Sequence, residues 1–208
     1  MSLPDERRRS LPRHVRSLLR AHRPLGIEDI RRQGARPAAV LVPILMAGPE
    51  PRVVFTERTT TLSRHAGEIS FPGGLAEPGE DLATTALRET EEELGLAPSD
   101  VELLGSLPPV HTHVSGILVV PFVGLLHTDP RFTPNDAEIA EILEFPLATL
   151  IDVGTERWFE REGLRFQTHV FEVDGKVVWG ATARILRSFL DLLEREPGMR
   201  AGPSSVTN

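Results

Sequence analysis

The sequence predicts an α/β fold in which a mixed β-sheet is packed between helices. Apolar runs of strand length recur along the chain with few helical patterns between them. A helical pattern follows a glycine-rich loop near the middle, and a second amphipathic pattern closes the chain. The length of 208 residues suits one compact domain with terminal extensions better than two domains.

The N-terminal segment, residues 1–34, is expected to form an arginine-rich helical extension. Its first nine residues are polar and are expected to be disordered. A helix over Leu11–Ala21 would carry Val15, Leu18 and Leu19 on one face and basic side chains on the other. Residues 35–196 would then form the main domain. Residues 197–208, which contain Pro, Gly, Ser and Asn, would form a flexible tail.

The main domain contains six apolar or alternating runs of strand length and two helical runs. The alternation of apolar and polar residues and the apolar runs predict the following strands: Ala38–Met46, Arg52–Glu57, Val101–Leu107, Ile117–Leu126, Glu141–Phe145 and Phe166–Val173. Helices are predicted over Asp81–Leu94 and over Ala181–Leu193, with Gly95 as a left-handed cap after the first.

Composition excludes several classes of protein. Hydrophobic residues make up 40% and charged residues 25%, as in an ordinary soluble globular protein, and no apolar run is long enough to span a bilayer. The arginine-rich N-terminus does not resemble a signal peptide. Cysteine is absent, which excludes disulfides and thiol chemistry and makes a cytoplasmic location the default. A net charge of −7 argues against general nucleic-acid binding.

The helix over residues 81–94 carries three acidic side chains on one patch. One side of this helix can pack on a sheet and carries Ala83, Ala86, Leu87, Thr90 and Leu94. On an adjacent side, Glu89, Glu92 and Glu93 are spaced i, i+3, i+4, so their carboxylates lie close together. Like charges at this spacing cost about 0.2–0.5 kcal/mol per pair, which a bound cation would offset. Ligands that offer only oxygen favour Mg²⁺ or Mn²⁺. An acidic run by itself is more often a solvated face, so the surrounding residues decide between the two interpretations.

Those surrounding residues resemble the signature of the Nudix hydrolases. The segment from Gly74 to Leu96 has a glycine, a glutamate and the R-E-x-x-E-E-x-G pattern at the family's spacing, with Glu80, Arg88 and Gly95 at fixed positions. Thr90 is the one departure, because it stands where a bulky aliphatic residue is usual; we expect altered packing and intact chemistry. The resemblance implies an α/β/α sandwich with a mixed sheet, so that residues 35–196 are a Nudix hydrolase domain.

The resemblance also implies roles for the residues of this signature. The Gly74 carbonyl and the carboxylates of Glu89, Glu92 and Glu93 would hold the metal ions, with Glu89 and Glu92 also counted as catalytic. Arg88 would orient a catalytic glutamate, and Glu80 would add an outer contact. Gly73, on the substrate side, and Gly74 would let the backbone approach a phosphate or a metal closely. The metals would neutralise a diphosphate and activate water.

The segment upstream resembles the coenzyme A pyrophosphatase subfamily. Thr56, Arg58, Gly67 and the run Phe71–Gly74 match its pattern, and the run Trp179–Ala183 is similar to a second one. The departures are Thr59, in place of Ser or Ala, and Ser63, in place of Arg; Arg64 lies one position later. The subfamily cleaves coenzyme A to 3′,5′-ADP and 4′-phosphopantetheine. Arg58 and Arg64 would grip the substrate's extra phosphates, since guanidinium binds phosphate oxygens bidentately.

Three residues outside these segments are further candidates for the site. Glu138 is expected to be a further metal ligand or the general base, because Nudix folds often bring a late acidic residue to the site. His111 and His113 alternate as on a strand, but two histidines without a third ligand are more typical of an ordinary loop. Their position after Leu107-Pro108-Pro109 leaves a role in a substrate loop open.

Other functions stay open at this stage. The expected partner is a small nucleoside diphosphate derivative, foremost coenzyme A, with ADP-ribose or NADH as the alternative substrate. No nucleic acid or membrane partner is expected, and a homodimer is compatible with the sequence. A non-catalytic Nudix-like binding module would not need all the metal ligands. The arginine-rich N-terminus alone would suggest a binder of nucleic acid or another anionic partner, recognisable by salt-dependent binding.

Overall fold

Two long parallel strands form the centre of the protein. In the computed structural model, which describes residues 5–20, 22, 24–60, 67–112, 116–161 and 164–194, β1 (Arg36–Leu45) pairs with β7 (Ile117–Leu126) along their whole length. Both strands are apolar and buried almost throughout. Strands of this kind require cover on both faces of the sheet, which places β1 and β7 inside the molecule.

The larger sheet is built outward from this pair and is mixed. Its strand order is β3-β2-β1-β7-β5, with β4 paired to β1, β6 to β7 and β8 to β2. Each of these outer pairings is antiparallel. The additional strands are β2 (Arg52–Arg58), β3 (Ile69–Ser70), β4 (Gly73–Leu75), β5 (Glu102–Ser106), β6 (Val110–His111) and β8 (Ile139–Pro146).

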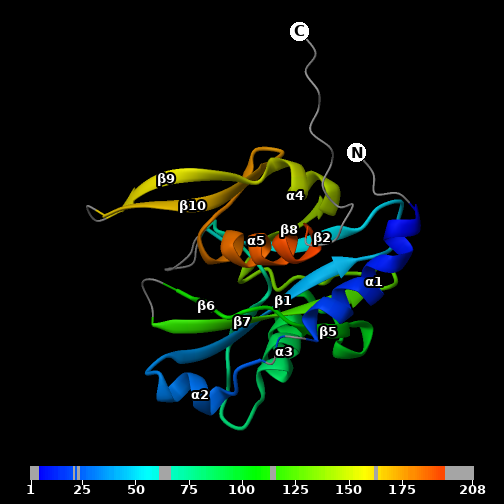
Figure 1. Ribbon diagram of the computed structural model, residues 1–208. Helices are drawn as coiled ribbons and strands as arrows, with labels where there is room; N and C mark the ends of the chain where they lie inside the picture. Colours follow the sequence, from blue (N-terminus) through cyan, green and yellow to red (C-terminus); the bar gives the residue numbers. More distant parts are fainter. Residues whose placement is uncertain are drawn as a thin grey trace.

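Helices cover the two faces of this sheet. In β1, Ala39 and Leu41 pack with α3 (Leu82–Leu94), whereas Val42 and Ile44 belong to the core cluster that includes α5 (Gly180–Glu194). Successive side chains of a strand point to opposite faces, so the two helices lie on opposite sides of the sheet, as Figure 1 shows. The predicted mixed sheet between helices is therefore confirmed.

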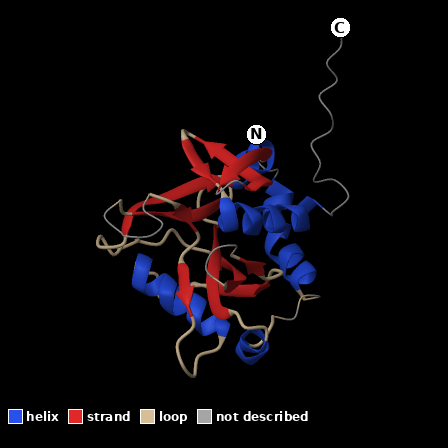
Figure 2. Ribbon diagram, turned by 90° about the vertical axis from the view of Figure 1, so that its left-hand side faces the viewer, coloured by secondary structure: helices blue, strands red, loops and turns tan. Residues whose placement is uncertain are grey.

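A smaller antiparallel sheet lies beside α5. It consists of β9 (Thr155–Arg161), β10 (Leu164–Val173) and β11 (Lys176–Val178), and it follows the short helix α4 (Leu147–Val153). Figure 1 shows the β9–β10 hairpin extending from the body of the molecule, and Figure 2 shows the larger sheet between its helices from the side. Phe171 of β10 is fully buried and anchors the base of the hairpin in the main core.

The N-terminal helix begins earlier than the sequence predicts. Helix α1 spans Asp5–Leu19, so residues 5–9, which were expected to be disordered, are helical. The spacing of Leu11, Val15 and Leu19 places them on one face of the helix. All three are buried in the core cluster that also contains residues of α5. Leu18, expected on that face, is only half-buried. The division of the chain at residue 34 stays a prediction, and the tail 197–208 lies outside the described residues.

Several short elements were not predicted. Besides β3, β4, β6, β9, β11 and α4, they include helix α2 (Ile27–Arg32) and a 3₁₀ turn (Pro98–Asp100). Helix α2 packs against the α3 side through the buried Ile30. Within the described part of the chain, no helix combines the length and the apolar character that crossing a membrane requires.

Candidate metal and catalytic site

Helix α3 is capped at both ends, and the sequence predicts the second of these caps, Gly95. Asp81 is the N-cap, and its carboxylate accepts a hydrogen bond from the Thr84 backbone N–H at 2.9 Å. Gly95 adopts the left-handed conformation with φ 66°, and its N–H donates to the Glu91 carbonyl at 2.8 Å. The ends of the helix, and therefore the positions of its glutamates along the axis, are set by these local interactions.

The buried face of α3 differs from the predicted face. Ala86, Thr90 and Leu94 are buried as expected, but Ala83 and Leu87 are only half-buried. The face is completed instead by Leu82, Thr85 and Glu93. Thr90, the departure from the family pattern, donates its hydroxyl to the Ala86 carbonyl at 2.7 Å. A polar group at this buried position is thereby satisfied within the helix.

Glu93 is the most buried acidic group of the candidate site. It is 5% exposed, and its carboxylate accepts hydrogen bonds from the Gly73 N–H at 3.2 Å and from Arg58 Nη1 at 3.4 Å. The pKa of Glu93 is raised to about 7, and burial is the largest cause. The nearby charges of Glu89 and Glu138 act in the same direction, whereas the Gly73 N–H and Arg58 act against them.

Glu89 lies directly against the glycine-rich strand β4. A Cβ atom added to Gly74 would stand only 2.4 Å from the Glu89 carboxylate carbon, so the absence of a side chain there makes room for this group. Burial raises the pKa of Glu89, and the charges of Glu92 and Glu138 act in the same direction. The carboxylates of Glu89, Glu93 and Glu138 therefore repel one another across a small region.

Arg88 is held by three carboxylates and one carbonyl. Its Nε donates to Glu80 Oε1 at 2.7 Å, and its guanidinium also pairs with Glu89 at 2.9 Å and with Glu92 at 3.1 Å. The Leu75 carbonyl accepts a further bond at 3.3 Å. The hydrogen bond from Arg88 lowers the pKa of Glu80 to about 2. Glu80 thus anchors Arg88, which in turn restrains Glu89.

Glu92 is the least constrained of the three helical glutamates. Its side chain is 58% exposed and its described ion pair is the one to Arg88. It lies close enough to Glu89 to raise the pKa of that group. The structure therefore places Glu92 at the edge of the site and Glu93 at its base, a distinction that helical spacing alone does not make.

Arg58 and Glu138 complete the cluster from the other side. Arg58 ends β2, and Glu138 directly precedes β8; Arg58 Nη2 lies 3.4 Å from Glu138 Oε2. The guanidinium of Arg58 thus lies between the Glu93 and Glu138 carboxylates, where its charge offsets part of their mutual repulsion. The resemblance to the coenzyme A pyrophosphatases implies instead that this guanidinium contacts a substrate phosphate.

The remaining candidates lie elsewhere or outside the described residues. Arg64 and His113 belong to the undescribed segments 61–66 and 113–115. His111 lies in β6 with an exposed side chain, and its carbonyl accepts a hydrogen bond from Arg184 of α5. None of the hydrogen bonds described for His111 reaches the carboxylates of α3.

Lys176 forms a contact that the sequence patterns do not predict. This residue of β11 pairs with Glu57 of β2 and Glu141 of β8, and its ammonium lies 2.7 Å from the Glu141 carboxylate. Lys176 therefore joins the smaller sheet to β2, which ends at Arg58, and to β8, which begins directly after Glu138. Lys176 is the single lysine of the chain, a signal that could have drawn attention to it.

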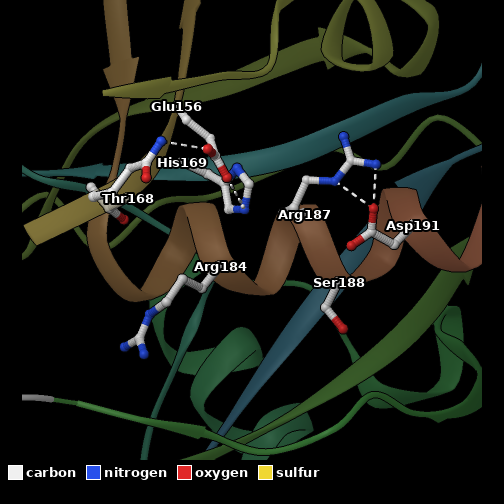
Figure 3. Close-up of a pocket in the computed structure, with 8 residues that line it drawn as sticks. Glu156, Thr168, His169, Arg184, Arg187, Ser188 and Asp191 are labelled. Carbon is white, nitrogen blue, oxygen red and sulfur yellow. Dashed lines mark hydrogen bonds and ion pairs between the residues drawn. The ribbon is translucent and has the colours of Figure 1, made fainter. Parts of the chain in front are cut away.

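One described cavity lies away from this cluster. It has a volume of about 460 Å³ and lies between the β9–β10 hairpin and α5 (Figure 3). Its charged groups are largely neutralised, since Arg187 pairs with Asp191 and Glu194, and His169 lies 3.8 Å from Glu156. In Figure 3, Arg184 points away from these pairs. The cavity is lined by Glu156, Gln167, Thr168, His169, Arg184, Arg187, Ser188 and Asp191, none of them a predicted site residue.

The carboxylate cluster suits a hard divalent cation by its chemistry. It offers only oxygen ligands, and its acidic groups are partly or wholly withdrawn from water while repelling one another. Over the described ranges, no three acidic or histidine side chains are already arranged around one point as a metal site. The guanidinium groups of Arg58 and Arg88 pair with these carboxylates, and a bound cation would take over part of this charge compensation.

Comparison with known proteins agrees with this geometry. A model of the NUDIX domain matches residues 35–166. A Pectobacterium atrosepticum protein named "Uncharacterized Nudix hydrolase NudL" is 40% identical over 156 residues, which cover 73% of this chain and 79% of the relative. A Yersinia pestis protein of the same name is 39% identical over 155 residues, which cover 73% of this chain and 77% of the relative.

Solved structures show the same fold at low sequence identity. A MutT/nudix family protein from Enterococcus faecalis has a TM-score of 0.52 and 14% identity, covering 93% of this chain and 76% of its own. The MutT protein from Methanosarcina mazei Go1 has a TM-score of 0.50 and 15% identity, covering 77% of this chain and 94% of its own. The domain match and the identity to the NudL proteins show that the chain belongs to the Nudix family and is a Nudix hydrolase.

Proposed function

We propose that this Nudix hydrolase is a metal-dependent pyrophosphohydrolase that cleaves coenzyme A to 3′,5′-ADP and 4′-phosphopantetheine. In this reaction water adds to one phosphorus atom of the diphosphate, and the bridging P–O bond breaks. The observation that carries the proposal is the convergence of Glu89, Glu93 and Glu138, from two distant segments of the chain, beside the glycines of β4. Nudix hydrolases generally need divalent metal ions.

Each residue of the cluster has a role in this proposal. Glu89 and Glu93 would be the inner metal ligands, with Glu92 and the Gly74 carbonyl as further ligands. A bound metal would neutralise the diphosphate and lower the pKa of a water molecule. Arg88, anchored on Glu80, would keep Glu89 in its position. Glu138 would accept the proton of the attacking water or add a ligand, and Gly73 would present its backbone to the substrate.

The choice of coenzyme A rests on the residues around the cluster. Two residues of the subfamily pattern lie at or near the cluster. Arg58 lies between Glu93 and Glu138, and Phe71 is buried beside Phe55, with the two ring centroids 4.7 Å apart. Gly180 of the second pattern starts α5 in the left-handed conformation with φ 67°. The names of the relatives give no substrate, so these positions are the support for coenzyme A over ADP-ribose.

A substrate screen tests this proposal. Coenzyme A, ADP-ribose and NADH would each be incubated with the protein and Mg²⁺ or Mn²⁺, and the product masses would be read. We expect 3′,5′-ADP and 4′-phosphopantetheine from coenzyme A, and no turnover in excess chelator. Faster cleavage of ADP-ribose than of coenzyme A would overturn the substrate assignment. Binding of these compounds without cleavage of any of them would point to a non-catalytic binding module.

A second measurement separates two roles for Arg58. If its guanidinium serves the carboxylates, as its contacts support, Arg58→Ala should lower kcat/KM for coenzyme A and dephospho-coenzyme A by the same factor. If it instead grips the 3′-phosphate, the loss should fall on coenzyme A alone, by roughly ten- to a hundredfold for a charge-assisted contact. We expect the first pattern, measured as kcat/KM for wild type and variant on both substrates.

A further inference from the structure

The loop before β8 is attached to the C-terminal end of α3. A helix leaves its last four carbonyls without partners inside the helix. Here the Thr133 N–H donates to the Leu94 carbonyl at 2.8 Å, and the Asn135 N–H donates to the Glu93 carbonyl at 2.9 Å. Glu93 therefore contributes its carboxylate to the candidate site and its carbonyl to this loop.

Asn135 also organises the turn that carries Glu138. Its side-chain oxygen accepts the Ala137 N–H at 3.2 Å, and its backbone carbonyl accepts the N–H groups of Glu138 at 2.9 Å and Ile139 at 2.8 Å. An asparagine oxygen bound to the N–H two residues later forms an Asx turn, which fixes the chain direction locally. Asn135 thus connects the end of α3 to the backbone of Glu138 in one short step.

Thr59, the residue after β2, holds the same turn through two further contacts. The Thr59 N–H donates to the Glu138 carbonyl at 2.8 Å, and the Thr59 hydroxyl makes a longer contact of 3.4 Å with the Ala137 carbonyl. Both polar backbone groups of Glu138 are therefore bonded, one through Asn135 and one through Thr59. Because both backbone groups of Glu138 are bonded, this residue cannot move far without breaking one of these hydrogen bonds.

We propose that Asn135 is a positioning residue, which holds Glu138 at a fixed place relative to Glu93 and Glu89. This inference rests on the proposed function, because it assumes that Glu138 acts in metal-dependent hydrolysis. Asn135→Ala would remove the side-chain acceptor while the backbone bond to Glu93 remains available. Asn135→Asp would keep an oxygen at the same place, so it separates the Asx turn from other consequences of the substitution.

A double-mutant cycle with hydrogen–deuterium exchange tests the assignment. We expect Asn135→Ala to lower kcat by roughly ten- to a hundredfold, as displacement of a catalytic group does, with KM changed by less than about threefold. Asn135→Asp should restore most of this loss. In the presence of Glu138→Gln, the further substitution Asn135→Ala should have no effect, because both changes act through one group. The amides of residues 137–139 should exchange faster in Asn135→Ala and at the wild-type rate in Asn135→Asp.

Asp136→Ala is the matched control, because it truncates the neighbouring exposed side chain of the same turn. It should leave kcat and amide exchange unchanged. Wild-type kcat in Asn135→Ala, or multiplied losses in the double variant, would overturn the inference. If the wild type cleaves a diphosphate other than coenzyme A, the substrate assignment fails alone, and the same cycle on that substrate decides the role of Asn135.

Discussion

At the scale of single residues, two adjacent glycines of β4 perform different tasks. Gly73 has a φ of 151°, and a Cβ atom there would stand 2.3 Å from the Ala39 carbonyl oxygen, a backbone atom that cannot move away. Gly74 has no left-handed conformation, and the three atoms nearest to its added Cβ all belong to the end of the Glu89 side chain. The fold therefore requires the absence of a side chain at Gly73, whereas its absence at Gly74 makes room for a candidate metal ligand.

This difference predicts that alanine at Gly74 mainly lowers activity, whereas alanine at Gly73 mainly lowers stability. Gly74→Ala should displace the Glu89 carboxylate and lower kcat by an order of magnitude or more, with little change in the unfolding temperature. Gly73→Ala should instead lower the free energy of unfolding by about 1–3 kcal/mol through backbone strain. Thermal unfolding and metal-dependent kinetics of both variants provide the measurement. A Gly74→Ala protein with wild-type kinetics would show that Glu89 is not needed at this place.

The same scale shows which site residues the sequence could predict. The spacing of Glu89, Glu92 and Glu93 could be predicted, because helical geometry relates neighbours on one helix. Their different exposure could not, because it depends on how α3 is rotated against the sheet, which brings Glu93 under Gly73. The contacts of Arg58 depend on the packing of β2, α3 and the loop before β8, which no local pattern encodes.

At the scale of elements, the end of α3 depends on a glycine and on the loop that covers it. Gly95 has φ 66°, and a Cβ atom there would stand 1.8 Å from the Thr133 hydroxyl oxygen. The capping conformation and the docking of the loop thus both require the absence of a side chain. The sequence predicted the cap from the position of Gly95, but not the second requirement, because Thr133 is remote in the chain.

Gly95→Ala should therefore destabilise the protein for two separable reasons. The left-handed conformation and the clash with Thr133 together should lower the free energy of unfolding by about 1–3 kcal/mol. The second substitution Thr133→Gly should recover the loss of stability that comes from the clash. The loss that comes from the left-handed conformation of residue 95 should remain. Denaturant unfolding of the single and double variants measures both losses. Equal stability of Gly95→Ala and wild type would contradict the docking of the loop on α3.

Element length explains which elements could be predicted. The predicted bounds of the long strands β1, β7 and β10 and of the helices α3 and α5 differ from the structure by at most two residues. Strands β3, β4 and β6, of two or three residues, were missed because such strands are defined by their pairing partners rather than by periodicity. Helix α1 begins before its prediction although Leu11, Val15 and Leu19, its described buried residues, all lie inside the predicted range. Once these residues hold a helix, its extension into the polar start costs little, because propagation of a helix is easier than nucleation.

At the scale of the whole molecule, the candidate site links local protonation to global stability. The pKa of Glu93 is raised from 4.5 to about 7 by burial. Between these values the folded protein holds a proton that the unfolded chain has lost. The contribution of this group to the free energy of unfolding is therefore present at low pH and is lost as pH rises through about 7. A metal ion requires the ionised carboxylate, so metal binding should act in the opposite sense.

The expected result is a metal-induced rise in unfolding temperature that grows with pH. Saturating Mg²⁺ or Mn²⁺ should raise the unfolding temperature little at about pH 6, where Glu93 holds its proton, and more at about pH 8, where the ionised group can bind the metal. Glu93→Gln should remove most of this rise and flatten the pH dependence of the metal-free protein. Glu91→Gln, which changes an exposed glutamate two residues earlier on the same helix, is the matched control and should behave as wild type. Calorimetric unfolding over this pH range, with and without metal, provides the measurement. An equal metal effect at both pH values, or its survival in Glu93→Gln, would mean that the ion binds away from Glu93, because a ligand that must first lose its proton makes binding depend on pH.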